Sequence, residues 1–320
     1  MHRMAFMDAC PARPAGPKPG AHVPPGEVPQ RAGAWVLGHE IGRGGTSVVY
    51  AARHRDARRG AVTGGAPRGA AAVKVARDGL PDEAAARFAD EARMLATFDH
   101  DGIVRMLGSG QLPDGRPYIA MARAWGEPVT RHTRRLPVSR RLAVFRSVCH
   151  AVAEVHRCGI VHCDLKPGNV FVALGGRVTL LDFGIARAPG AAAGALLLTP
   201  DFAAPEQLLG ETLSLATDVY ALGLLLHDVL CGSRRRVPWG LSGGGPTVFS
   251  GTLTGTLPDG ARLAALRAAA PVTRADGRTA RLTDGLRDVL ATALHTDPAR
   301  RYSSAACLAR AVERAAPHAF

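Results

Sequence analysis

The sequence predicts an α+β protein with two lobes, a small β-rich lobe followed by a larger helical lobe. Two patterns indicate this order. Short apolar runs separated by Gly-rich turns fill residues 34–124, and helical periodicity dominates residues 125–316. Residues 1–33 are rich in Pro, Gly and Ala without a hydrophobic period, so we expect a disordered leader there.

The small lobe is expected to hold five strands and one helix. The helix begins at Pro81 and ends near Phe98, and Glu91 shares its inward apolar face with Phe88 and Leu95. The expected strands span residues 35–37, 47–51, 71–75, 103–107 and 117–121.

The large lobe is expected to be mainly helical. Helices are predicted at residues 142–157, 217–230, 286–294 and 305–315, with Thr217 as the N-cap of the second. Two short strands are predicted at residues 169–172 and 178–181. Residues 240–284 show no clear pattern because Gly and Pro interrupt them.

The charge and composition exclude several classes of protein. The net charge of +13 is spread along the chain, and aromatic residues make up only 5%, so we expect no nucleic-acid partner. No apolar run is long enough to span a membrane, and the first residues lack the apolar stretch of a secretion signal. The six Cys form no C-x-x-C pair. We therefore expect a cytoplasmic protein without a membrane anchor, zinc site or disulfide framework.

Lysine is rare in this basic chain, and its positions are informative. Of the 40 Lys and Arg residues, only Lys18, Lys74 and Lys166 are Lys. A lysine ammonium is a compact point charge that a planar guanidinium does not replace. Lys74 and Lys166 lie in motifs that handle phosphate, so the composition indicates phosphoryl transfer.

A Gly-rich turn precedes the first of these lysines. The turn from Gly42 to Tyr50 is typical of a loop whose backbone N–H groups approach phosphates. Lys74 ends the third predicted strand, and Glu91 is the single acid on the inward face of the next helix. Burying a carboxylate is costly unless it is paired. We therefore expect Lys74 to pair with Glu91 and to hold the first two phosphates of ATP.

The segment from His162 to Asn169, His-Cys-Asp-Leu-Lys-Pro-Gly-Asn, carries the strongest signal. Phosphoryl transfer needs a carboxylate that accepts the proton of the attacking hydroxyl, and Asp164 supplies it. It also needs a cation beside the moving phosphoryl group, which Lys166 supplies. Oxygen ligands for Mg²⁺ come from Asn169 and from Asp182, which opens the segment Asp-Phe-Gly.

These motifs resemble those of the eukaryotic-like protein kinases, specifically the bacterial serine/threonine kinases. The resemblance covers roughly residues 34–315 and implies a bilobal protein-kinase-like fold. It implies ATP with Mg²⁺, or Mn²⁺ in its place, as cofactors, and proteins with Ser/Thr acceptors as substrates. It also implies that Glu206 pairs with Arg301 and that Asp218 ties down the catalytic loop. The residues implied to act in catalysis are Asp164, Lys166, Asn169 and Thr199. The residues implied to bind the nucleotide are Gly42, Gly44, Val49, Ala72, Lys74, Glu91, Met121 and Ala124. The residues implied to bind the metal are Asn169 and Asp182.

The chain departs from the family pattern at several positions. Ser47 replaces the third glycine of the loop, and Leu198 stands where a Gly usually precedes Thr-Pro. Cys163 stands where many members carry an Arg that keeps the activation segment disordered until a phosphate neutralises it. Thr199 is the only hydroxyl residue between Asp182 and Glu206. We therefore hypothesise that activity does not require phosphorylation of the activation segment.

Two alternatives stay open. Ser47, Leu198 and the altered hinge at residues 122–124 favour a pseudokinase that serves as a nucleotide-binding scaffold. A small-molecule phosphotransferase of related fold would share the order Asp, Asn, Asp, but Lys166 and the Thr199-Pro200 step favour a protein substrate. No sensor domain is recognisable in the sequence, so an activating signal would come through a regulatory partner protein.

Overall fold

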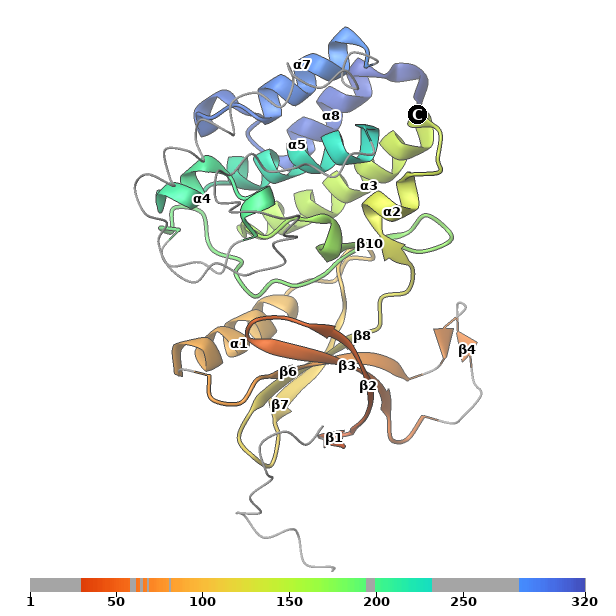
Figure 1. Ribbon diagram of the computed structural model, residues 1–320, viewed down its shortest axis with the longest axis vertical. Helices are drawn as coiled ribbons and strands as arrows, with labels where there is room; N and C mark the ends of the chain where they lie inside the picture. Colours follow the sequence, from red (N-terminus) through yellow and green to blue (C-terminus); the bar gives the residue numbers. More distant parts are fainter. Residues whose placement is uncertain are drawn as a thin grey trace, which may run out of the picture.

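The chain folds into two lobes joined by the segment that follows strand β8 (Figure 1). A computed structural model describes residues 30–57, 62–63, 66–67, 69–80, 82–193, 199–231 and 282–319. A twisted antiparallel sheet with one long helix forms the first lobe, and packed helices form the second (Figure 1). The predicted α+β bilobal fold class is therefore confirmed.

The described strands of the small lobe form a sheet in the order β1-β2-β3-β6-β8-β7. Their bounds are β1 Arg31–Ala32, β2 Trp35–Arg43, β3 Ser47–His54, β6 Ala70–Ala76, β7 Met106–Gln111 and β8 Pro117–Ala122. Helix α1, Asp82–Leu95, lies against this sheet. A short hairpin, β4 Val62–Thr63 and β5 Ala66–Pro67, occupies the connection between β3 and β6.

The two faces of the sheet carry different side chains, because successive residues of a strand point to opposite faces. Val73 and Val75 of β6 pack in a core with Tyr50 on one face. Ala72 and Lys74 alternate with them and point to the other face, where α1 covers the sheet with Phe88. The Lys74 side chain therefore points from the sheet towards α1 and the large lobe.

The structure corrects two details of the small lobe. Strand β1 lies inside the predicted leader, because Arg31 and Ala32 pair with the first residues of β2. The predicted leader, residues 1–33, is therefore wrong at residues 31 and 32, and residues 1–29 lie outside the described residues. Strand β7 begins at Met106 rather than at Ile103, which instead forms a parallel bridge with Leu180 of the large lobe.

The large lobe is built around two helices, α3 and α5. Residues 216–230 of α5 are all buried, and α3 packs against α5 and α8. The helices are α2 Val129–Thr133, α3 Val138–Arg157, α4 Pro205–Leu209, α5 Leu215–Cys231, α7 Asp284–Ala293 and α8 Ala305–Ala315. The strands are β9 Glu127–Pro128, β10 Val170–Val172 and β11 Val178–Leu180, and single 3-10 turns span Pro167–Asn169, Pro200–Phe202, Pro298–Arg300 and Pro317–Ala319.

One predicted cap is wrong. Helix α5 begins at Leu215, so Thr217 lies inside it, and the Thr217 hydroxyl accepts the N–H of Ser214. The poorly patterned residues 240–284 lie outside the described residues except for 282–284. Within the described ranges, no helix combines the length and the apolar character that a membrane crossing demands.

Candidate active site

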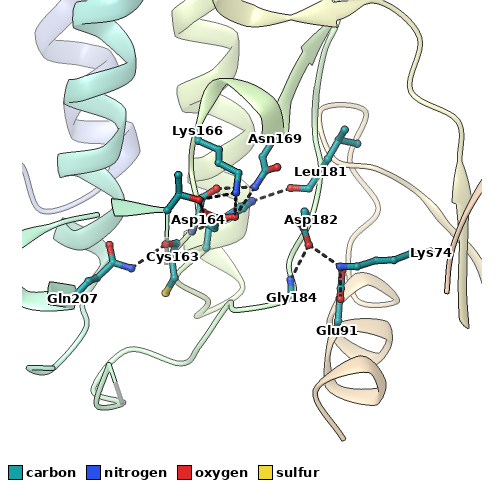
Figure 2. A network of polar contacts seen from close by, with 12 residues as sticks. Lys74, Glu91, Cys163, Asp164, Lys166, Asn169, Leu181, Asp182, Gly184 and Gln207 are labelled. Atoms are coloured by element: carbon teal, nitrogen blue, oxygen red, sulfur yellow. Dashed lines mark hydrogen bonds and ion pairs between the residues drawn. The ribbon is translucent and has the colours of Figure 1, made fainter. Parts of the chain in front are cut away.

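Lys74 and Glu91 form a buried ion pair that joins the sheet to α1. The Lys74 Nζ lies 2.7 and 2.8 Å from the two Glu91 carboxylate oxygens, and the side chains are 9% and 2% exposed. The same nitrogen lies 2.7 Å from Asp182 Oδ1, in the segment that follows β11 of the large lobe. Lys74 thus connects the two lobes (Figure 2).

The charges in this cluster stabilise one another. Burial opposes the charge of Lys74, but the carboxylates of Asp182 and Glu91 outweigh it and raise the pKa of Lys74. The Lys74 ammonium lowers the pKa of Asp182 well below its usual range, against the opposing effect of burial. Both groups are therefore charged at neutral pH, as a site for phosphates and a divalent cation requires.

The Asp164 carboxylate is the centre of a second network. Lys166 Nζ donates to Asp164 Oδ2 at 2.6 Å, and Asn169 Nδ2 donates to the same oxygen at 2.9 Å. Thr199 Oγ1 donates to Asp164 Oδ1 at 2.9 Å and accepts from Lys166 at 2.7 Å. The structure therefore brings together the four residues predicted for catalysis, three of which are labelled in Figure 2.

A buried acid from α5 holds the backbone of the catalytic loop, residues 162–169. Asp218 accepts the N–H groups of His162 at 2.8 Å and of Cys163 at 2.9 Å, and it lies 3.0 Å from His156 Nε2. Cys163 has a φ of 67°, a left-handed backbone that costs about 1–3 kcal/mol in a residue other than Gly. The surrounding hydrogen bonds are what maintain it. The geometry agrees with the anchoring role expected for Asp218.

His162 has a structural place in this loop. Its Nδ1 accepts the N–H of Asp164 at 3.3 Å, and its Nε2 lies 3.2 Å from the carbonyl oxygen of Leu181. The ring packs against Phe183 with 4.6 Å between ring centroids, and Phe183 in turn lies 5.1 Å from Phe98. Because both ring nitrogens contact backbone groups, His162 is a structural member of the loop and positions Asp164.

The residues predicted at the nucleotide share the sheet face that carries Lys74. In the register of the sheet, Val49 lies opposite Lys74, and Ala72 lies opposite Met121. Met121 is buried, whereas Val49 and Ala72 are half-buried. Small and apolar side chains thus lie beside Lys74 in the sheet, which fits an adenine site on this face.

The Gly-rich turn closes the end of this face. Gly42 pairs with Val49 at the end of β2, and the Gly44 N–H donates to the Ser47 carbonyl oxygen at 2.8 Å. Ser47 is the first residue of β3, so its backbone is that of an ordinary strand and needs no glycine. Ala124 lies half-buried in the segment between β8 and the large lobe.

The donor set at Asn169 and Asp182 fits Mg²⁺. Asn169 uses its amide nitrogen towards Asp164, which leaves its oxygen directed away from Asp164 (Figure 2). Asp182 bonds Lys74 through Oδ1, and its side chain is 44% exposed, so a second oxygen is accessible. Mg²⁺ is commonly bound by one or two such oxygens together with substrate phosphates. In the described ranges, His, Cys, Asp and Glu form no cluster of three that would suggest a different metal.

A second buried ion pair anchors the activation segment, residues 182–206. The guanidinium of Arg301 donates to the Glu206 carboxylate at 2.7 and 2.8 Å, and both side chains are almost fully buried. Arg301 also donates to the carbonyl oxygens of Ala216 and Thr296 and lies over the Tyr220 ring. The pair implied by the family resemblance is thus present as a contact.

Two contacts of this region were not predicted. Gln207, next to Glu206, donates from Nε2 to the carbonyl oxygen of Cys163 at 2.9 Å. His156 lies against Asp218 on the buried face of α3. A polar residue on the apolar face of a helix, such as His156, could have signalled a buried polar partner. Nothing in the local sequence marks Gln207.

Of the departures from the family pattern at positions 163 and 198, the structure describes only the first. Cys163 is buried, its Sγ lies 3.4 Å from the Val161 carbonyl oxygen, and burial raises the pKa of its thiol. A small buried residue therefore occupies the position where many family members carry a cation. Leu198 lies outside the described residues.

Comparison with known proteins agrees with this geometry. Residues 35–312 match the family described as "Protein kinase domain". The chain is 36% identical over 212 residues to the DNA damage-responsive serine/threonine-protein kinase RqkA of Deinococcus radiodurans, a match covering 63% of this chain and 30% of the relative. It is 38% identical over 159 residues to the serine/threonine-protein kinase PknA of Mycobacterium tuberculosis, covering 46% and 37%.

A third relative gives the same result. The chain is 35% identical over 212 residues to the serine/threonine-protein kinase Pkn1 of Myxococcus xanthus, covering 63% of this chain and 29% of the relative. The match therefore spans about a third of the length of these curated relatives.

Proposed function

The chain belongs to the protein kinase family, and we propose that it is an ATP-dependent serine/threonine protein kinase. It would transfer the γ-phosphate of ATP to Ser or Thr hydroxyls of protein substrates. The observation that carries this proposal is the assembly of Lys74, Asp164 and Asp182, with Asn169, at the junction of the lobes. Each carries a charge or an oxygen that phosphoryl transfer requires.

Asp164 is proposed as the acceptor of the substrate proton. Its Oδ1 already accepts a hydrogen bond from the Thr199 hydroxyl at 2.9 Å, so an alcohol can reach this oxygen. Lys166, 2.6 Å from the other oxygen, keeps a positive charge beside the reacting group. A positioned base of this kind contributes about 10²–10⁴-fold to a rate.

The nucleotide and metal would bind where the lobes meet. Lys74, held by Glu91, would bind the first two phosphates of ATP, and the turn at Gly42 and Gly44 would cover them. Asn169 and Asp182 would hold Mg²⁺, or Mn²⁺, which when bound neutralises negative charge on the phosphates.

The experiment that tests this proposal measures transfer from γ-labelled ATP to a generic basic protein, followed by identification of the labelled amino acids. We expect label on Ser and Thr from the wild-type chain and none above background from Lys74→Met. Equal label from both would indicate contamination and favour the pseudokinase. ATP consumption with sugars, choline or aminoglycosides, without protein labelling, would favour a small-molecule phosphotransferase.

Independence from activation-segment phosphorylation is also proposed. It is supported by Cys163, which leaves position 163 without a cation, and by Thr199, the only hydroxyl residue between Asp182 and Glu206, whose side chain is bonded to Asp164. Protein treated with phosphatase and checked by intact mass should keep its activity. Loss of activity together with a lost phosphate in residues 183–205 would contradict this.

The cellular context of the whole protein is a proposal as well. We infer action in the cytoplasm, where ATP is supplied, as part of signalling, with a regulatory partner protein that brings the activating signal. A comparison of the phosphoproteins of the host with and without the gene would identify the substrates. Unchanged phosphorylation would contradict the signalling role.

A further inference from the structure

Gln207 links the activation segment to the catalytic loop through a neutral amide. Its Nε2 donates to the carbonyl oxygen of Cys163 at 2.9 Å, and its Oε1 accepts the N–H of Ala204 at 2.9 Å. The side chain is 3% exposed and reaches from α4 towards Cys163 (Figure 2).

The two hydrogen bonds fix which way the amide faces. A rotation that exchanged its oxygen and nitrogen would point the NH₂ group at the Ala204 N–H and the oxygen at the Cys163 carbonyl. The Gln207 NH₂ group would then face another donor, and the Gln207 oxygen would face another acceptor, and both contacts would be buried. Gln207 is therefore held in one orientation, and it acts as a donor towards the catalytic loop.

The group that Gln207 holds is the peptide next to the catalytic carboxylate. The Cys163 carbonyl and the Asp164 N–H belong to one planar unit. Gln207 holds its oxygen, and His162 Nδ1 accepts its N–H at 3.3 Å. Asp218 holds the preceding N–H of Cys163, whose φ is 67°. The rotation of this peptide, which sets where Asp164 points, is thus fixed from both sides.

The other end of the link is rigid. Glu206, adjacent to Gln207 in α4, forms the buried pair with Arg301. Arg301 is bonded in turn to the carbonyl oxygen of Ala216 in α5. A short helix fixed in this way carries the Gln207 side chain at a set distance from the catalytic loop.

We propose that Gln207 is a positioning residue for phosphoryl transfer. Its amide connects the end of the activation segment to the peptide before Asp164 and orients the carboxylate, and it needs no phosphate to do so. The inference rests on the proposed kinase function. It assigns to a neutral hydrogen bond the connection between α4 and the peptide before Asp164, in a chain with no cation at position 163.

The test compares two substitutions with a stability control. Gln207→Glu keeps an oxygen for the Ala204 N–H but loses the donor to Cys163, and Gln207→Met keeps the length and loses both bonds. Leu286→Ala shortens a buried side chain of α7, away from the catalytic loop. For each, kcat and the KM for ATP are measured per folded molecule, with urea unfolding as the measure of stability.

We expect both Gln207 variants to lower kcat by about ten- to a hundredfold, because small misplacements of a reacting group have effects of this size. The KM for ATP should stay near the wild-type value, because no nucleotide residue changes. Leu286→Ala should lower the urea midpoint and leave kcat per folded molecule unchanged. In Gln207→Glu, amide hydrogen exchange should accelerate at residues 162–165 and stay unchanged in α7.

The outcomes separate the two proposals. Wild-type activity with undiminished kcat in Gln207→Glu would overturn the role of Gln207 alone, and so would a loss explained by unfolding. If Gln207→Met does not fold, the Gln207→Glu variant decides. Absence of transfer by the wild-type chain would overturn this inference together with the proposed function.

Discussion

The chain contains two buried ion pairs of similar geometry and different construction. Lys74 bonds two carboxylates, Glu91 and Asp182, and Asp182 is 44% exposed. Arg301 bonds one carboxylate, Glu206, and fills its remaining donors with carbonyl oxygens of the large lobe. An incoming group can therefore replace Asp182 as a partner of Lys74, whereas no partner of Arg301 can be replaced in this way.

The same kind of interaction therefore serves two purposes in this chain. An ammonium shared by two acids keeps a surplus of negative charge that a metal ion can take up, and it can exchange a carboxylate for a phosphate. A guanidinium whose donors are all satisfied holds its neighbours permanently. We therefore expect the Lys74 cluster to control activity and the Arg301 pair to control stability.

Arg301→Met should give the largest effect, on stability. It leaves the Glu206 carboxylate buried and unpaired, which costs about 3–5 kcal/mol. Urea unfolding measures this. The matched control is Arg157→Met, which removes a pair with Glu154 on the surface and should have a far smaller effect. Equal losses in the free energy of unfolding would show that the buried pair stabilises the fold no more than the surface pair does.

Asp182→Asn should give the next largest effect, on activity. The loss of its charge should lower kcat by about 10²–10³-fold, a size common for the removal of one electrostatic contact to the reacting groups. The free energy of unfolding should fall less than in Arg301→Met, because the Asp182 side chain is partly exposed and Lys74 keeps Glu91 as a partner. A large loss of stability with retained kcat would show that Asp182, like Arg301, contributes to stability and not to activity.

Glu91→Gln should have a smaller effect. The amide can still accept a hydrogen bond from Lys74, and Asp182 still supplies a negative charge 2.7 Å away. We expect kcat/KM for ATP to fall about tenfold, equivalent to ~1.4 kcal/mol. A loss as large as that of Asp182→Asn would show that Lys74 depends on Glu91 for its position as well as for its charge.

Alkylation of the cysteines should separate buried from exposed sites with no effect on activity. Hydrogen bonds from Ser303 and Ser304 lower the pKa of Cys307, whereas burial raises the pKa of Cys163 and of Cys149. With iodoacetamide at neutral pH, peptide mass spectrometry should find Cys307 modified before Cys149, and Cys163 unmodified. Fast modification of Cys163 with loss of activity would contradict its role as a buried spacer.

The parts of the site that could be predicted are those written in short segments. Glu91 was recognisable because a lone acid on an apolar helix face needs a cation, and Lys74 was the available one. Asp164 and Asp182 were recognisable because their spacing between strands is that of a phosphate-transfer site. Local chemistry was sufficient for these residues.

The parts that could not be predicted depend on contacts between distant segments. Gln207 gains its place only when α4 meets the catalytic loop, 44 positions away in the chain. Thr217 resembles a cap, but packing extends α5 by one more half-turn, to Leu215. Strand β1 exists because β2 pairs with it, and its own two residues carry no strand pattern.

The rate of a single turnover with saturating Mg²⁺ and γ-labelled ATP, compared between the wild-type chain and Asp164→Asn, tests the central claim most directly. Asparagine keeps the size of Asp164 and removes its ability to accept a proton. We expect label on Ser or Thr of the protein substrate from the wild-type chain and transfer slower by about 10²–10⁴-fold from the variant. Equal rates from the two proteins would contradict it.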